Sequence, residues 1–457
     1  MITQRPQFVP SRRGAPTPRS GSRQPFDADR NAYAFRDKAR GEGTPPPSRP
    51  FASRCIIASV AVCLAPIVAA ATPPPPRHAA KAVVINDDGF SAFFNGSYQS
   101  LDDVHKRMLS HRATPVAVLE WCVTGGSRVN YPSQVSELIG EGLAEFPRRG
   151  DRQAYETLRR FADRGVNLTE AVAAACREAG MLCYASMRMN GDYAKSADGD
   201  LNQRQFNSTF WWKNPDKRVR GAKGEDKTKL SYAFPEVRAF KLGILREVAV
   251  TAVDGVNLDF LRHPPFFGYD EPLLQAFREK YGEDARTVKP TDPRWLDLRC
   301  EVMTGFVGAL RRLLDEAGAK RGRRLGLSVR VDWREYRAWG CDLERWLKAG
   351  WLDYVVIAQH TLGGYEFDLR PFVAMAQGTG CAVYFGEEAV LSGHDLTAKE
   401  DRLIAAGQLV RPKRDRVSPE QYRTRAAQWY EAGADGVHLF NTYAPDDIRA
   451  AAGLPLK

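Results

Sequence analysis

The stretch GVNLDFLRHPPFF occupies residues 255–267. It begins as an apolar run typical of a β-strand, carries Asp259 near its end, and is followed at once by Arg262, His263 and two prolines. Side chains alternate along a strand, so Asn257 and Asp259 share one face and the apolar residues between and beside them share the other. A proline after His263 keeps that residue extended and prevents a direct turn into a helix. The stretch therefore predicts a buried strand that brings a carboxylate and two basic groups to its tip.

Seven more runs of this kind alternate with amphipathic stretches of helical spacing. With 254–261, the predicted strands are 82–87, 115–122, 181–188, 325–332, 353–360, 381–388 and 435–442, and the clearest helices are 168–180, 235–253, 301–318 and 419–433. Strands that alternate with helices indicate right-handed βαβ units and a parallel sheet. Eight units predict the α/β class and a closed (β/α)₈ TIM-type barrel over residues 81–457. A doubly wound open sheet is the alternative, but no GxGxxG follows the first run.

The residues before the barrel have a different composition. Residues 1–54 are rich in Pro, Arg, Gly and Ser, which predicts a disordered basic leader. Residues 55–71, CIIASVAVCLAPIVAAA, are uncharged and end in Ala-Ala-Ala, as in the apolar core and cleavage site of a signal peptide. An uncleaved membrane anchor is the alternative, and residues 72–80 form a Pro-rich linker. We expect an exported protein that is periplasmic, secreted or membrane-anchored.

Charge and cysteine spacing exclude several classes of function. The formal charge of +11 is concentrated in the leader, where residues 1–54 hold 11 Lys and Arg against 4 Asp and Glu. The rest of the chain carries only +4, so we expect no nucleic-acid partner. Six cysteines follow the apolar segment 55–71 without a CxxC pair, which predicts buried thiols, with one disulfide as the alternative. The spacing of His and Cys indicates no metal site, and we expect no cofactor.

Other charged residues lie at the predicted strand ends, where barrels of this kind build their sites. In the run 325–332, Arg330 and Asp332 share a face, next to the strand that carries Asp259. Burying unpaired charge costs several kcal/mol, so these groups need each other or a polar ligand. Further candidates at strand ends are Asp87, Asp88, Glu120, His360 and the pair Glu387-Glu388, of which one must point inward.

Two inserts follow predicted strands on the same face of the barrel. Residues 189–234 are polar and Lys-rich and contain Trp211 and Trp212, and residues 389–417 are charged. Carboxylates surrounded by aromatic side chains suit a sugar ligand. Hydrolysis of a glycoside needs one carboxylic acid to protonate the leaving oxygen and one carboxylate to attack or to activate water.

The segment FPEVRAFKLGILREVAVTAVDGVNLDFLRHP, residues 234–264, resembles the central motif of the family-ten glycosyl-hydrolase-like proteins, which are exported barrel proteins of bacteria. The segment GADGVHLFNT, residues 433–442, resembles their last strand. The resemblance covers most of residues 81–445 and implies a TIM-type barrel that hydrolyses O-glycosidic bonds of a poly- or oligosaccharide. Familiar retaining barrel glycosidases place Glu after strands four and seven, whereas strand four of this chain offers Asp259.

We therefore predict Asp259 and one of Asp332, Glu387 or Glu388 as the carboxylate pair. An arrangement like that of the amylase-type barrels would pair Asp259 with Asp332. The substrate-binding candidates are Asp87, Asp88, Glu120, Asn257, Arg262, His263, Arg330, His360, Trp211 and Trp212. A structural salt bridge is the alternative role for Asp259. The rival function is a non-catalytic glycan-binding barrel, and ester hydrolysis is weaker because no G-x-S-x-G motif is present.

Overall fold

The computed structural model describes residues 81–192, 204–360 and 365–455. Eight parallel strands close into a barrel in the order β1-β12-β11-β10-β9-β8-β5-β2. They are β1 (Ala82–Asp87), β2 (Val116–Cys122), β5 (Leu182–Arg188), β8 (Gly255–Asp259), β9 (Gly326–Asp332), β10 (Tyr354–Ala358), β11 (Ala382–Glu388) and β12 (Gly436–Phe440). Each predicted run contains one of these strands, so the predicted barrel is confirmed.

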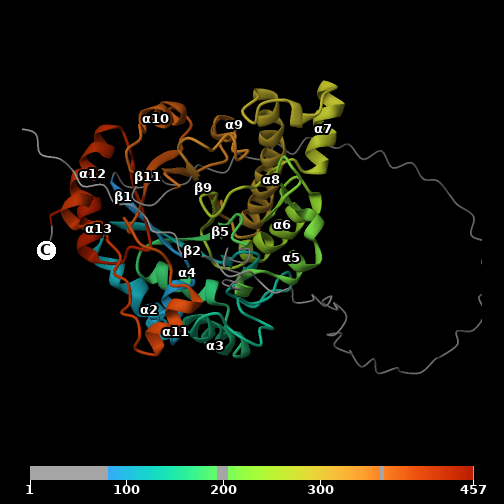
Figure 1. Ribbon diagram of the computed structural model, residues 1–457. Helices are drawn as coiled ribbons and strands as arrows, with labels where there is room; N and C mark the ends of the chain where they lie inside the picture. Colours follow the sequence, from blue (N-terminus) through green and yellow to red (C-terminus); the bar gives the residue numbers. More distant parts are fainter. Residues whose placement is uncertain (1–80, 193–203, 361–364, 456–457) are drawn as a thin grey trace, which may run out of the picture. The chain divides into compact units, whose positions relative to one another are not determined.

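Helices surround the barrel (Figure 1). The four predicted helices are present as α4 (Leu168–Glu178), α6 (Pro235–Ala249), α8 (Pro293–Lys320) and α12 (Pro419–Glu431). Helix α8 begins eight residues before its predicted start, because Asp292 caps it through the amide of Arg294 and Pro293 fits its first turn. The other helices are α1 (Ser91–Phe94), α2 (Leu101–Leu109), α3 (Arg149–Asp163), α5 (Thr209–Lys213), α7 (Glu271–Tyr281), α9 (Leu343–Lys348), α10 (Arg370–Ala376), α11 (Ala398–Ala405) and α13 (Pro445–Ala451).

The two inserts carry small elements of their own. The first contains α5 and a hairpin of β6 (Arg218–Arg220) and β7 (Asp226–Leu230), and the second contains α11. A two-residue hairpin, β3 (Thr124–Gly125) and β4 (Arg128–Val129), follows β2. Sequence periodicity does not reveal these short pieces.

The lower interior of the barrel is filled by tyrosines, and glycines on the strands make room for them. Tyr184, Tyr354 and Tyr384 lie in one buried cluster with small apolar side chains of the inner face. A Cβ atom on Gly255 would lie 2.6 Å from the Tyr184 ring, and one on Gly436 would lie 2.5 Å from the Tyr384 ring. Gly255 at the start of β8 and Gly436 at the start of β12 therefore leave room for a tyrosine ring where any larger residue would clash with it.

The outward residues of the strands pack on the helices in one large core. Val256, Leu258 and Phe260 belong to it, as do the outward residues of β9. This alternation agrees with the predicted faces and leaves Asn257, Asp259 and Arg330 inside.

Several predicted features lie outside the described residues: the leader 1–54, the apolar segment 55–71 and the linker 72–80. No helix in the described part of the chain is long and apolar enough to span a membrane. The six cysteines after the apolar segment 55–71 are buried free thiols. All described residues fall within Ala69–Lys457, which forms one compact unit by its contacts.

Candidate functional site

Three charged side chains, from β8, β9 and β11, meet at the carboxyl ends of the barrel strands. Arg330 on β9 contacts Asp259 on the neighbouring β8, with Nη1 3.4 Å from Oδ2. The same guanidinium donates from Nη2 to Glu388 Oε1 on β11, at 2.7 Å. Arg330 and Asp259 are fully buried, and the side chain of Glu388 is 16% exposed. The structure thus brings two predicted carboxylates, Asp259 and Glu388, to the guanidinium of a third predicted residue, Arg330.

The pair Glu387-Glu388 is divided between the two faces of β11. Glu388 points inward and accepts from Arg330 and from Arg262, whose Nη2 lies 2.8 Å from Oε1. Glu387 forms a buried ion pair with Arg425 of α12 instead. The prediction that one of the two must point inward is met by Glu388, because side chains alternate along a strand.

The two arginines set the ionisation of Glu388. Burial by itself would raise the pKa of Glu388, but the charges of Arg262 and Arg330 outweigh it and hold that pKa below its ordinary value. Glu388 is therefore a carboxylate at neutral pH, the form that a nucleophile or a general base needs.

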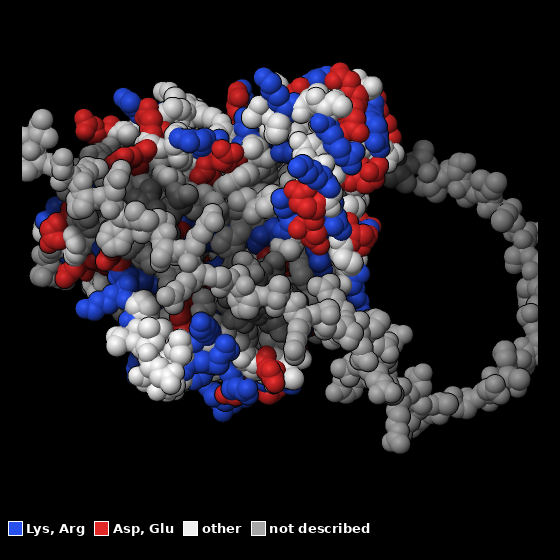
Figure 2. All heavy atoms as spheres, viewed as in Figure 1, with Lys and Arg blue, Asp and Glu red and all other residues white. Residues whose placement is uncertain are grey.

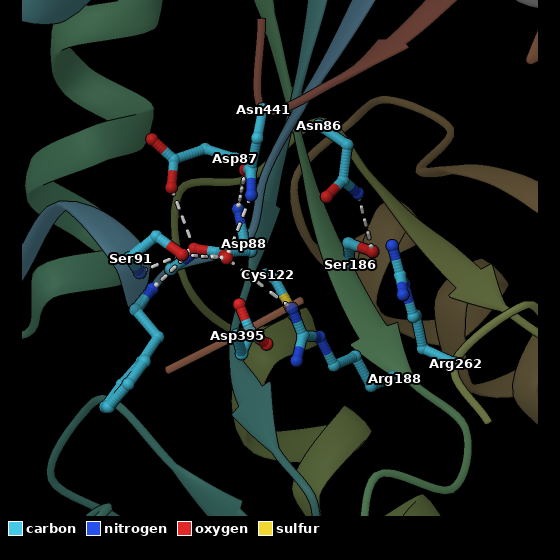
Figure 3. A network of polar contacts seen from close by, with 12 residues as sticks. Asn86, Asp87, Asp88, Ser91, Cys122, Ser186, Arg188, Arg262, Asp395 and Asn441 are labelled. Atoms are coloured by element: carbon cyan, nitrogen blue, oxygen red, sulfur yellow. Dashed lines mark hydrogen bonds and ion pairs between the residues drawn. The ribbon is translucent and has the colours of Figure 1, made fainter. Parts of the chain in front are cut away.

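A second ion pair lies on the β1 side of the mouth (Figure 3). Asp88 Oδ2 lies 3.7 Å from Arg188 Nη2, at the end of β5. Asp88 and Asn441 exchange two hydrogen bonds of 3.0 and 2.9 Å, which join the loop after β1 to the end of β12. Burial opposes the ionised form of Asp88, but Arg188 and Ser91 outweigh it and lower its pKa. The Asp88 carboxylate is thus an ionised partner of Arg188.

Asp87 lies behind the mouth, where it contacts residues of the segment between β1 and α2. It accepts from the amide of Gly89 at 2.9 Å and from the hydroxyl of Tyr98 at 3.0 Å. Burial and the neighbouring charge of Asp88 raise the pKa of Asp87 to about 6. Asn86 of the same strand points into the barrel, so Asp87 lies on the opposite face, away from the barrel mouth.

Beneath the mouth, a ring of polar side chains crosses the barrel interior. Glu120 accepts from Asn86 at 3.0 Å, from Tyr354 at 2.8 Å and contacts His438 Nε2 at 3.0 Å. Burial would raise the pKa of Glu120, but His438 and the other donors outweigh it and lower the pKa.

Asn257 belongs to the same ring. It accepts from Ser186 and donates to Ser328, both at 2.9 Å. Because Glu120 and Asn257 are fully buried and hydrogen-bonded to other side chains of the ring, they form the floor of the site.

Asp332 organises the loop after β9. Its Oδ1 accepts from the amides of Arg334 and Glu335 at 2.9 and 2.8 Å, and its Oδ2 accepts from the amide of His360 at 2.8 Å. Both carboxylate oxygens are thus engaged with backbone groups, and the residue joins the ends of β9 and β10.

The basic residues after β8 are close to other cations. Arg262 lies over the ring of Phe440, 4.4 Å from its centroid. Burial, then Arg262, Lys229 and Arg188, hold the pKa of His263 well below its ordinary value, so its ring is neutral. Burial and Arg262 also lower the pKa of His360, and the two imidazole centroids are 6.4 Å apart. The rings are therefore placed as neutral hydrogen-bonding groups.

The two tryptophans of the first insert differ in their surroundings. Trp211 is buried, donates from Nε1 to the Thr228 carbonyl at 2.7 Å, and stacks on Arg218 with 3.5 Å from Cζ to the ring centroid. Trp212 packs edge-on against Trp211 and is 49% exposed. Only Trp212 offers a ring face to solvent.

Sequence analysis missed two residues of the mouth, Arg188 and Asn441. Arg188 has a signal in the alternation Tyr184, Ser186, Arg188 along β5, which places it inward. Asn441 has none, because its role depends on closure of the barrel between β12 and β1. In the described parts of the chain, no group of three or more His, Cys, Asp or Glu is arranged to hold a metal ion.

Residues 144–361 match the family model described as glycosyl hydrolase-like 10. The match includes α6, β8 and β9, so it confirms the resemblance that residues 234–264 carry. Asp259 and Arg330 lie within it, and Glu388 lies beyond its end. The sequence matches none of the curated proteins.

Solved structures of several glycosidases are similar to this chain at low identity. A glycoside hydrolase family 18 N-acetylglucosaminidase from Paenibacillus barengoltzii has 12% identity and a TM-score of 0.38, over 82% of this chain and 98% of that one. The cell-surface chitinase ChiW from Paenibacillus sp. str. FPU-7 has 12% identity and a TM-score of 0.41, over 82% of this chain and 32% of that one. An alpha-galactosidase from Thermus thermophilus has 14% identity and a TM-score of 0.38, over 84% and 67%. This chain therefore spans about a third of the chitinase.

Proposed function

We propose that the protein is an exported glycoside hydrolase that cleaves O-glycosidic bonds of a poly- or oligosaccharide, with Asp259 and Glu388 as its carboxylate pair. The observation that carries this proposal is the single guanidinium of Arg330, which contacts both carboxylates at the barrel mouth. The match to the glycosyl hydrolase-like 10 family supports a carbohydrate substrate.

The separation of the two carboxylates suits this chemistry. The two contacts and the width of one guanidinium leave Asp259 Oδ2 and Glu388 Oε1 at most roughly 8.5 Å apart. Glycosidase pairs stand about 5–5.5 Å apart in retaining enzymes and about 6.5–9.5 Å apart in inverting enzymes. The upper limit on the carboxylate separation is compatible with both a retaining and an inverting enzyme. The anomeric configuration of the product distinguishes these two mechanisms.

The surroundings of the two carboxylates assign them different roles. Glu388 is held ionised by two arginines and is the group that attacks the anomeric carbon or activates water. Asp259 has the longer contact with Arg330 and also accepts from the amide of Leu261 at 3.1 Å. In this proposal it takes the second role, that of proton donor to the leaving oxygen. Arg262, Arg188, Asp88 and the neutral rings of His263 and His360 border the mouth, where they would position sugar hydroxyls.

Glu387 and Asp332, the other members of the predicted carboxylate set, have other roles in this proposal. Glu387 stabilises the contact of β11 with α12, and Asp332 holds the loop after β9. Glu120 and Asn257 support the floor of the site, and Trp212 is a stacking platform at its periphery.

One observation favours a second function, a non-catalytic glycan-binding barrel. Asp88, Asp259 and Glu388 each contact an arginine, and the pKa values of Asp88 and Glu388 lie below the ordinary range. An acid catalyst needs a carboxyl that keeps its proton near neutral pH. In this alternative the arginines would serve only to neutralise the carboxylates at the mouth of the barrel.

The experiment uses residues 79–457, which contain the whole barrel, with and without Asp259→Asn. Both proteins are incubated with plant, algal and bacterial-wall polysaccharides while new reducing ends are counted. The proposal expects cleavage by the parent protein that Asp259→Asn removes while its circular dichroism spectrum is unchanged. Saturable glycan binding by both proteins without any cleavage would establish the glycan-binding function instead.

A further inference from the structure

The segment after β11 leaves the barrel as a projection whose two ends are tied together. Val390 and Arg416 form an antiparallel bridge, and the amide of Leu391 donates to the Asp415 carbonyl at 2.8 Å. Ser392 also donates to the Asp415 carboxylate at 2.5 Å. The projection therefore has a fixed base.

Its helix, α11, is docked on α3. The backbone amide of Arg149 donates to Asp401 Oδ2 at 3.0 Å, and the two side chains form an ion pair. Arg148 donates to the carbonyl of Leu396 at 3.1 Å. Thr397 and Glu400 form a capping box at the start of the helix. Residues 402–413, which we call the basic tip, comprise the last turn of this helix and the loop after it.

The basic tip exposes apolar side chains. Val410 is 89% exposed, more than any other large hydrophobic residue in the described ranges, where the next is Val250 at 72%. Leu403, Ile404 and Leu409 near it are only partly buried. Figure 2 shows uncharged atoms gathered at the place where Figure 1 has α11 and the loop after it, with Lys and Arg atoms beside them. An exposed aliphatic cluster on a preformed loop favours a partner with an apolar phase.

The charges around these apolar residues are mainly positive. Residues 399–416 contain six Lys and Arg and three Asp and Glu. The three acidic side chains are engaged at the base: Glu400 with Thr397, Asp401 with Arg149 and Asp415 with Ser392. Among the described residues, no carboxylate lies within ion-pair distance of Arg402, Arg411 or Lys413. The solvent side of the tip is therefore cationic.

We propose that the basic tip docks this domain on an anionic phospholipid surface. Val410 would enter the headgroup layer while Arg402, Arg411 and Lys413 lie at the level of the phosphates, the arrangement typical of interfacial membrane binding. A soluble polyanion would satisfy the cations but would leave the aliphatic cluster in water. Because the projection leaves β11 at its carboxyl end, docking holds the mouth of the barrel close to that surface.

The test measures flotation of residues 79–457 with vesicles of phosphatidylcholine, with and without 30 mol% phosphatidylglycerol. This fragment omits the apolar segment 55–71 and keeps every strand of the closed barrel. The proposal expects binding to the anionic vesicles only, decreasing as NaCl is added. Arg411→Gln/Lys413→Gln should weaken binding on the order of 30-fold, and Val410→Ser roughly tenfold.

Two matched variants control for charge and apolarity. Arg312→Gln/Lys320→Gln on α8 removes the same charge from exposed positions elsewhere, and Val250→Ser removes the second most exposed aliphatic side chain. Both should bind as the parent does. Absence of binding by the parent, or equal binding by tip and control variants, overturns the proposal. Tip-dependent binding of soluble dextran sulfate without vesicle binding also overturns it and assigns the tip to an anionic polysaccharide.

Discussion

Arg330 on β9 donates to Glu388 on β11, 2.7 Å away, across the intervening strand β10. The strand order makes this contact cross the end of β10, and the other end of the same guanidinium reaches Asp259 on β8. A buried cation between two carboxylates fixes both of them, since its planar group donates in two directions. The contacts of Arg330 with Asp259 and Glu388 lie inside the barrel, whereas the ion pair of Arg425 with Glu387 lies outside it. Substitutions in the two places should therefore have different effects.

The adjacent residues Glu387 and Glu388 provide the first test. Glu388→Gln should lower the rate of glycan cleavage by roughly a hundredfold to ten-thousandfold, because it removes the ionised catalytic group. Glu387→Gln should keep the rate but lower the free energy of unfolding by about 3 kcal/mol, because it leaves Arg425 buried without its partner. Initial rates and urea unfolding of both variants check this. Equal effects of the two substitutions on the rate would contradict the assignment.

Arg330→Met should destabilise the fold by roughly 3–5 kcal/mol at pH 7, because Asp259 and Glu388 then face each other without their shared cation. The folded pKa of Glu388 is below its unfolded value, so its contribution to stability is present above about pH 4.3 and is lost as the pH falls through the folded pKa. Removing Arg330 raises that pKa, so the cost of the substitution should shrink as the pH falls toward 4.5.

Urea unfolding at pH 7 and at pH 4.5 measures this change. Arg425→Met, on the outer pair with Glu387, is the matched control that should lower stability without abolishing cleavage. A cost of Arg330→Met that is the same at both pH values would show that the two carboxylates do not depend on this cation.

Asp87 should make stability fall as the pH rises. Its folded pKa of about 6 lies above the unfolded value of 3.8, so between these values the folded state holds more protons than the unfolded state. The free energy of unfolding therefore decreases by roughly 3 kcal/mol across this window. Asp87→Asn should remove the decrease and gain stability relative to the parent between pH 4 and pH 7.

Urea unfolding at several pH values checks the sign. Asp292→Asn is the control, because the pKa of Asp292 is lowered by its hydrogen bond with Arg294 and it stays ionised throughout the window. A pH profile of Asp87→Asn that runs parallel to that of the parent would show that Asp87 does not titrate there.

The two neighbouring tryptophans should respond differently to truncation. Trp211→Ala should cost about 3–5 kcal/mol of stability, because the ring is buried and hydrogen-bonded to the Thr228 carbonyl. Trp212→Ala should leave the midpoint of unfolding nearly unchanged and raise KM for a polymeric glycan. Thermal unfolding together with Michaelis kinetics distinguishes them, and an unchanged KM in Trp212→Ala would exclude a stacking role.

The inner faces of the strands could be predicted because the period of two is local. Asn257, Asp259 and Arg330 follow from it, and so does the choice between Glu387 and Glu388 once the register of β11 is known. Partners from distant strands could not be predicted. Asp88 meets Asn441 only because the barrel closes between β12 and β1, and it reaches Arg188 on β5 across the intervening strand β2. No spacing in the sequence encodes either contact.

The loop carboxylate Asp332 shows another limit. Its place at the end of β9 was correct, but its oxygens bind backbone amides of the following loop and of His360. Whether a strand-end carboxylate faces a ligand or holds its own loop depends on loop conformation, which side-chain alternation does not determine. The alternation also does not show that Glu120 meets His438 inside the barrel.

The central claim is that Asp259 and Glu388 act as one catalytic pair. The most direct measurement compares kcat/KM of residues 79–457 with that of Asp259→Asn, Glu388→Gln and the double variant on a cleaved glycan. Substitutions of groups that act as a unit have strongly non-additive effects on the rate. Each single variant should therefore lose at least about a hundredfold in kcat/KM. The double variant should lose no more than the less active of the two single variants. Losses that multiply in the double variant, or cleavage that survives both substitutions, would contradict the account.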